Sequence, residues 1–275
     1  MKAMTSSITC LLGAGYSYAA GAPLAKDLLR PKQLITMSDR SRQRFLAVQE
    51  HYETWQKAYP NESSEQYMGH VFKGEAGINP PKWEWLVEYI CTSIASASTS
   101  LPSLNRSPRY SNRINRPLDC PIHSAFWKAV STATRQISVI TTNYDTFVER
   151  ILRHRAMRRP PSAGCFYGGL PRPQVLKGAA QPFSRWAPER WIEMTGTIPV
   201  MKLHGSLNWT LLGESIIVFQ DMRAVFRHGG TAAIVPPIPE KPVPRWLAEV
   251  WLEAEASLRR SESPSAKKVS GISRL

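Results

Sequence analysis

The first stretch of this sequence that could do chemistry is a glycine-rich turn, GAGYS at residues 13–17. Gly13, Ala14 and Gly15 would let the main chain turn sharply and let a ligand approach it closely. A helix after such a turn directs unpaired N–H groups and partial positive charge at the ligand. These properties suit a pyrophosphate, to which Ser17 would add a hydroxyl donor. A plain strand-to-helix turn without a ligand is the alternative, because a glycine-rich turn alone is a weak signal.

Two later stretches supply groups that catalysis would need. Asn143 and Asp145 end the run ITTNYD. A buried asparagine must have its amide satisfied, so it clamps either a loop or a ligand. His204 lies in KLHGS, with Gly205 behind it to open space. An imidazole titrates near neutral pH and suits general-base work at the mouth of a crevice, although a lone histidine is also often structural.

The elements that must position these groups are visible as periodic apolar runs. Each group lies in or directly after a segment that predicts a buried strand, at 7–12, 136–145 and 198–209. We also expect strands at 215–219 and 231–237, and helices at 18–29, 39–58, 80–95, 122–134, 145–155 and 243–260. A polar segment leads to about residue 80, residues 98–118 predict a loop, and residues 156–198 show only weak periodicity.

Short apolar strands that alternate with helices predict an α/β fold. We expect a Rossmann-like three-layer domain with a central, mostly parallel sheet and helical insertions. Ligands of such sheets bind outside the carboxyl ends of the strands. If the three strands are neighbours, their polar ends converge on one crevice. The domain is expected to span residues 1–260, with a helical insertion at about 39–118, and to be followed by a polar tail at 261–275.

Length and composition limit the partners. The chain has 275 residues, of which 43% are hydrophobic, enough for a sizeable core. No apolar stretch approaches the roughly 20 residues of a membrane-spanning helix, and the N-terminus lacks the apolar core of a secretory signal. A cytoplasmic protein without membrane contact is therefore expected. The net charge is +14, but the basic clusters are not interleaved with aromatic residues, so direct nucleic-acid binding is not the expected function.

The cysteines are spaced too widely for a zinc knuckle. The chain has four, Cys10, Cys91, Cys120 and Cys165, and no two form a C-x-x-C pair. We therefore expect free thiols and no metal site.

Taken together, GAGYSYAAGAP, ITTNYD and KLHGS resemble the motif set of SIR2-like NAD-consuming domains, the group that includes the sirtuins. The three motifs stand in the family's order, each at a strand end, and the resemblance runs from about residue 6 to residue 252. KWEWLVEYI and IVPPIPEK resemble segments of the bacterial anti-phage defence branch. The resemblance implies NAD as the substrate and no metal.

The resemblance also implies a role for each matching residue. Asn143 would orient the nicotinamide ribose and the attacking water, and His204 would act as the base; these two are the catalytic residues. The residues that would contact NAD are Gly13, Ala14, Gly15, Ser17, Pro23, Thr142, Asp145, Gly205 and Ser206. The first four would cradle the pyrophosphate, and Asp145 would contact the nicotinamide carboxamide.

The sequence departs from the deacylases of the family. They carry a zinc module with two C-x-x-C pairs, which this chain lacks, so water is the expected acceptor and an NAD glycohydrolase the expected activity. Anti-phage members deplete NAD when infection is sensed, so a sensor protein or a homo-oligomer is the expected partner. The alternatives are a degenerate module that binds NAD or ADP-ribose without turnover, a protein deacylase, and nucleic-acid binding through the basic surface. The G-x-G-x5-G spacing disfavours a hydride-transfer enzyme.

A second departure lies near the end of the sequence. The family usually follows its last helix with a strand that ends in a G-Y-S-like turn, whereas only VSGISRL stands here. Residues 261–275 are therefore expected to be an unrelated tail or a truncated end of the domain.

Overall fold

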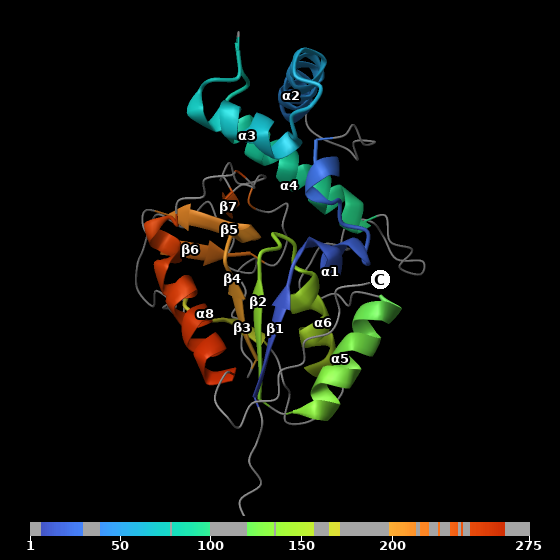
Figure 1. Ribbon diagram of the computed structural model, residues 1–275, viewed down its shortest axis with the longest axis vertical. Coiled ribbons are helices and arrows are strands. Elements are labelled where there is room, and N and C mark those ends of the chain that lie inside the picture. Colours follow the sequence, from blue (N-terminus) through green and yellow to red (C-terminus); the bar gives the residue numbers. More distant parts are fainter. Residues whose placement is uncertain are drawn as a thin grey trace, which may run out of the picture.

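The computed structural model describes residues 7–29, 39–77, 79–99, 120–134, 136–156, 165–170, 198–212, 215–219, 225, 232–235, 238 and 243–261. At its centre is a four-stranded parallel sheet with the strand order β1-β2-β4-β3 (Figure 1). The strands are β1 (Ser7–Leu12), β2 (Gln136–Thr141), β3 (Cys165–Tyr167) and β4 (Ile198–Lys202). This arrangement confirms the predicted α/β class.

The strands β1, β2 and β4 end level with one another. In the register of the sheet Leu12 pairs with Thr141, and Thr141 pairs with Lys202. Residues that follow these strands therefore leave the sheet at the same edge. The predicted convergence of the three polar strand ends is confirmed.

Helices cover both faces of the parallel sheet (Figure 1). The helices α5 (Pro121–Ala133) and α6 (Phe147–Ala156) lie on one side, and α8 (Ala248–Ser261) packs against β1 and β4 on the other. Pro121 stands at the first position of α5, where its missing N–H costs no hydrogen bond. Val139, Val200 and Val250 are among the fully buried residues of the core between these layers. The structure is thus the three-layer domain that the sequence predicts.

A helical group stands beyond the carboxyl edge of the sheet (Figure 1). It consists of α2 (Asp39–Ala58), α3 (Ser64–Lys73) and α4 (Trp83–Thr99). Their buried aromatic and aliphatic residues form one core cluster that also includes Tyr144, Leu207 and Ile234. Glu88 on α4 accepts hydrogen bonds from Ser41 Oγ at 2.9 Å and Arg44 Nη1 at 3.2 Å, which fasten α2 to α4. These helices occupy the predicted insertion up to residue 99; residues 100–118 lie outside the described part, and the domain boundaries remain predictions.

Helix α3 corrects the prediction of a polar segment up to residue 80. Its start is fixed by a reciprocal capping box, in which Ser63 Oγ accepts from Gln66 N and Gln66 Oε1 accepts from Ser63 N. Its end is fixed by Gly74 in the left-handed conformation. The segment is polar in composition, but Tyr67, Met68 and Val71 are buried against the other two helices.

The helix predicted at 18–29 is wrong. The structure has a single turn, α1 (Ala14–Tyr18), and a short 3-10 turn at Ala25–Asp27. The N–H groups of Ala20 and Ala22 both bond to Ser17 O, and Gly21 has a φ of 86°. These turn hydrogen bonds and the left-handed conformation of Gly21 end the helix, so it cannot continue to residue 29.

The strand predicted at 198–209 is in fact two strands. β4 ends at Lys202, and β5 (Gly205–Leu212) begins after a two-residue turn. β5 pairs antiparallel with β6 (Ser215–Val218) and β7 (Ala232–Ile234) in a second sheet of order β6-β5-β7. The last two strands confirm the predictions at 215–219 and 231–237. The short strand β3 lies within 156–198, where weak periodicity predicted no element.

No helix within the described residues combines the length and the apolar character that crossing a membrane requires. The four cysteines are all buried and free, as the sequence predicts.

Candidate functional site

The glycine turn follows β1 and is open to a ligand. Gly13, Ala14 and Gly15 are exposed, and a Cβ added to either glycine would meet no heavy atom within 4 Å. Because α1 has only five residues, attraction for a ligand comes from the individual N–H groups of the turn rather than from a long helix dipole. Main-chain atoms at this turn can therefore be approached closely from outside.

Asn143 joins the glycine turn to the end of β2. Its Nδ2 donates to Gly13 O at 2.8 Å and to Ser17 Oγ at 2.7 Å, and both it and Ser17 are buried. Its main-chain N–H donates to Thr141 Oγ1 at 3.1 Å. The amide orientation is fixed by the Gly13 carbonyl, which can only accept. Two of the predicted motifs are therefore in direct contact through this side chain.

The two residues after Asn143 are held in place by hydrogen bonds that their main-chain carbonyl oxygens accept. Tyr144 O accepts from Leu207 N at 2.9 Å and from Ser206 Oγ at 3.2 Å, and Asp145 O accepts from Lys202 Nζ. The side chain of Asp145 is buried, and its Oδ1 accepts from Phe147 N at 2.9 Å, which caps the start of α6. In this structure the Asp145 carboxylate therefore stabilises the loop and the helix after it.

His204 stands in the turn between β4 and β5. Its carbonyl accepts from Val235 N at 2.8 Å, and its half-buried ring lies 6.2 Å, centroid to centroid, from the ring of Tyr144. Gly205 behind it has a φ of 77°, a conformation that favours glycine. Ser206 is fully buried, and its Oγ lies 2.7 Å from Asn208 Oδ1. Ser206 thus stabilises the loop of Asn143 through its contact with Tyr144 O. His204 lies at the carboxyl edge of the sheet.

Two other predicted residues have different positions. Thr142 is exposed at the end of β2, and its N–H donates to Leu12 O at 3.3 Å. This contact places Thr142 beside the end of β1. Pro23 is half-buried after the turn at Gly21, and no hydrogen bond among the described residues links it to the other site residues.

The structure adds an aromatic anchor of the glycine turn that sequence reasoning missed. The rings of Tyr16 and His123 stack at 3.8 Å with an interplanar angle of 1°. His123 Nε2 donates to Tyr16 O at 2.6 Å, and Trp127 Nε1 donates to Tyr16 Oη at 2.8 Å. Burial lowers the pKa of His123 and outweighs the hydrogen bond that the ring donates to Tyr16 O, so the neutral Nε2–H tautomer is favoured. The helical spacing of His123 and Trp127 was the available signal, but their partner is distant in sequence.

A positive group also lies near the loop of Asn143. Burial lowers the pKa of the Arg150 guanidinium to about 10, whereas nearby Asp145 raises it. Arg150 remains protonated at neutral pH and adds positive potential behind the candidate site.

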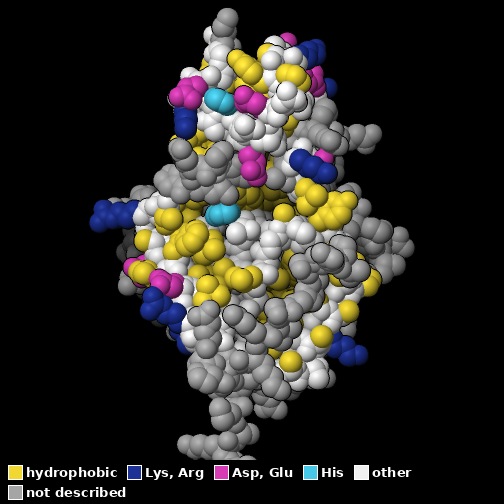
Figure 2. Space-filling model, viewed as in Figure 1, with side chains coloured by type: hydrophobic (Ala, Val, Ile, Leu, Met, Phe, Trp, Pro, Cys, Tyr) yellow, Lys and Arg dark blue, Asp and Glu magenta, His cyan; other side chains and the backbone are white. Residues whose placement is uncertain are grey.

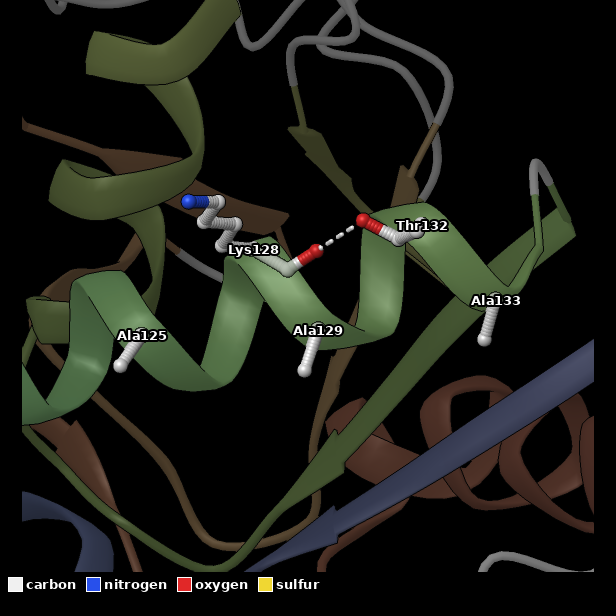
Figure 3. A pocket seen from close by; sticks show the side chains of 5 residues that line it. All are labelled: Ala125, Lys128, Ala129, Thr132 and Ala133. Atoms are coloured by element: carbon white, nitrogen blue, oxygen red, sulfur yellow. Dashed lines mark hydrogen bonds between the residues drawn. The ribbon is translucent and has the colours of Figure 1, made fainter.

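Figure 2 shows one face of the molecule, hollowed between the helical group and the sheet, with hydrophobic side chains in the hollow and a histidine side chain at its rim. A separate shallow hollow of about 490 Å³ lies against the outer face of α5 (Figure 3). Its lining residues are Ala125, Lys128, Ala129, Thr132 and Ala133. It contains no acid, amide or imidazole, so it does not compete with the strand ends as a candidate site. Among the described residues, no group of His, Cys, Asp and Glu is placed to hold a metal ion.

The geometry defines a class of protein. A parallel sheet covered by helices, with glycines, an amide and an imidazole at its carboxyl edge, is a Rossmann-like α/β domain. Residues 137–227 match the family model described as SIR2-like domain. This match confirms the resemblance seen in the motifs and suggests an NAD-related function. The matched stretch contains Asn143 and His204, and the glycine turn precedes it. No curated protein matches the sequence.

Proposed function

We propose that this protein is an NAD glycohydrolase, which cleaves NAD to nicotinamide and ADP-ribose. The observation that carries the proposal is the amide of Asn143, bound to Gly13 O and Ser17 Oγ at the shared edge of three parallel strands. This contact unites a turn suited to pyrophosphate with the loop that would hold the nicotinamide ribose. The SIR2-like match supports NAD as the ligand.

The reaction requires positioning and charge stabilisation more than a strong nucleophile. Water adds to C1′ of the ribose, the bond from C1′ to the pyridinium nitrogen breaks, and nicotinamide leaves as a neutral molecule. The transition state resembles an oxocarbenium ion, so groups that orient the ribose and the water lower the barrier. His204 would accept the proton that the water loses.

Asn143 is suited to orient this reaction. Its Nδ2 is used within the protein, and its Oδ1 has no hydrogen-bond partner among the described residues. Oδ1 would therefore accept a hydrogen bond from the ribose hydroxyl or the water. Because the amide is anchored on its other side, this acceptor is held in place before the ligand arrives.

A second candidate function is a module that binds NAD or ADP-ribose without turnover. The engaged amide of Asn143 and the helix-capping role of Asp145 favour it, because both contacts stabilise the apo fold. Such a module would use the same glycine turn for the pyrophosphate.

We propose further that NAD depletion serves bacterial anti-phage defence in the cytoplasm. An enzyme that destroys NAD must be restrained in a healthy cell, so a sensor protein or a homo-oligomeric switch would control it. The motif resemblance to the defence branch supports this part of the proposal.

The test is NAD consumption by the purified protein, with nicotinamide and ADP-ribose separated by chromatography. His204→Ala is expected to lower turnover about a hundredfold, because a positioned general base contributes that much. His70→Ala, a half-exposed histidine on α3, is the matched control and should leave turnover unchanged. Equal turnover in wild type and His204→Ala would contradict the assignment. Binding of NAD without turnover by wild type would favour the binding module.

A further inference from the structure

A lysine and a glutamate form a buried ion pair beneath the candidate site. Lys202 is the last residue of β4 and is 1% exposed, and Glu149 on α6 is 0% exposed. Lys202 Nζ lies 3.1 Å from Glu149 Oε1. The same Nζ donates to the main-chain oxygen of Asp145. Neither residue belongs to the set that the motifs assign to NAD.

A contribution to the stability of the fold does not by itself explain why Lys202 and Glu149 are buried together. Burying two charges costs several kcal/mol per ion by general estimates, and apolar residues of similar volume often replace such pairs without loss. What apolar residues could not supply is the hydrogen bond to Asp145 O. A hydrogen bond from a charged donor is shorter and stronger than a neutral one.

We propose that Lys202 is a positioning residue, which fixes the loop of Asn143 through the carbonyl of Asp145 and depends on Glu149 to hold its ammonium group in place. The loop is short, and each of its residues is tied to its surroundings. Asn143 N is bound to Thr141 Oγ1, Tyr144 O to Ser206 Oγ and Leu207 N, and Asp145 O to Lys202 Nζ.

The ammonium of Lys202 is the charged donor among these contacts. Its loss would free the end of the loop and let the Asn143 amide tilt away from Gly13 O and Ser17 Oγ. As a role in catalysis, the inference rests on the proposed NAD hydrolysis. As a statement about the orientation of Asn143, it can be tested without any turnover.

The experiment compares Lys202→Met with the double variant Lys202→Met/Glu149→Met. The single variant leaves a carboxylate buried without its partner and should unfold at clearly lower urea concentration than wild type. The double variant removes both charges and should recover most of that loss. Its kcat for NAD is nevertheless expected to stay at least tenfold low, because the Asn143 amide is no longer held in place.

Recovery of both stability and kcat in the double variant would overturn the proposal, since the pair would then be only structural. Should the double variant fail to fold, Lys202→Gln/Glu149→Gln keeps a polar pair in the same place and is read in the same way. The shorter amide should still lose the contact with Asp145 O.

A second readout does not depend on NAD hydrolysis. With ¹⁵N-labelled asparagine, the side-chain NH₂ signal of Asn143 can be assigned by its absence in Asn143→Ala. Its protons should exchange slowly in wild type, because both are hydrogen-bonded, and at least tenfold faster in the double variant. Faster exchange in a protein without NAD turnover would refute the proposed function and keep the positioning role. Unchanged exchange would refute the positioning role whatever the turnover.

Discussion

Asn143→Ala is expected to lower NAD turnover about a thousandfold, because one substitution removes a ligand acceptor and an anchor of the site. The variant loses the Oδ1 atom that would orient the ribose or the water. It also loses both Nδ2 hydrogen bonds, to Gly13 O and Ser17 Oγ, which hold the glycine turn against the end of β2. The rate is measured under saturating NAD, so that a change in binding does not obscure it.

Two controls separate this loss from unfolding. Removing the buried amide should lower the free energy of unfolding by about 1–3 kcal/mol, which a folded domain can tolerate and urea titration can measure. Ser17→Ala removes only one of the two contacts and should reduce turnover far less. If Asn143→Ala and Ser17→Ala have the same activity, Asn143 acts only as a loop clamp.

Gly205→Ala is expected to destabilise the fold by about 4 kcal/mol, near the upper end of single substitutions. Gly205 has a φ of 77°, and its added Cβ would lie 2.0 Å from Ala233 O. That oxygen belongs to the main chain of β7, which is tied to this turn by the bond from Val235 N to His204 O. Relief of the clash therefore requires the two strands to separate.

Gly74→Ala is the matched control for this prediction. Gly74 has a φ of 73°, but a Cβ there would meet no heavy atom within 4 Å. It should cost only the backbone strain, about 1–2 kcal/mol. Urea unfolding of both variants separates the clash from the strain, and equal losses would show that β5 and β7 do not meet closely at Gly205.

The sheet could be predicted because its strands have strong local signals. The runs SITCLL and QISVIT are apolar or β-branched; the first forms a strand with the predicted bounds, and the second forms the first six residues of the strand predicted at 136–145. Their polar ends then converge because parallel strands share an edge. Helix α2 was predicted with its observed bounds, since Phe45, Val48, Tyr52 and Trp55 recur at helical spacing.

The features that were missed depend on contacts between distant residues. Nothing near His204 in the sequence shows that the first sheet ends there and a second one begins, because the turn depends on Gly205 packing against Ala233 O. Nothing near Lys202 shows that its ammonium meets Glu149, which lies on a helix 53 positions earlier. The sequence is compatible with either a loop or a ligand as the partner of the Asn143 amide, and the structure shows that its nitrogen binds the glycine turn.

The central claim is that the glycine turn and the loop of Asn143 form one NAD site. The most direct measurement is calorimetric titration of NAD into the protein, in a His204→Ala background so that the ligand is not consumed, with and without Gly15→Val. A Cβ added at Gly15 would meet no heavy atom within 4 Å, so the variant should keep its stability and lose at least tenfold in NAD affinity. Ala129→Val on the exposed face of α5 is the control and should bind like its parent. Equal NAD affinity with and without Gly15→Val, or no binding in either, would contradict the account.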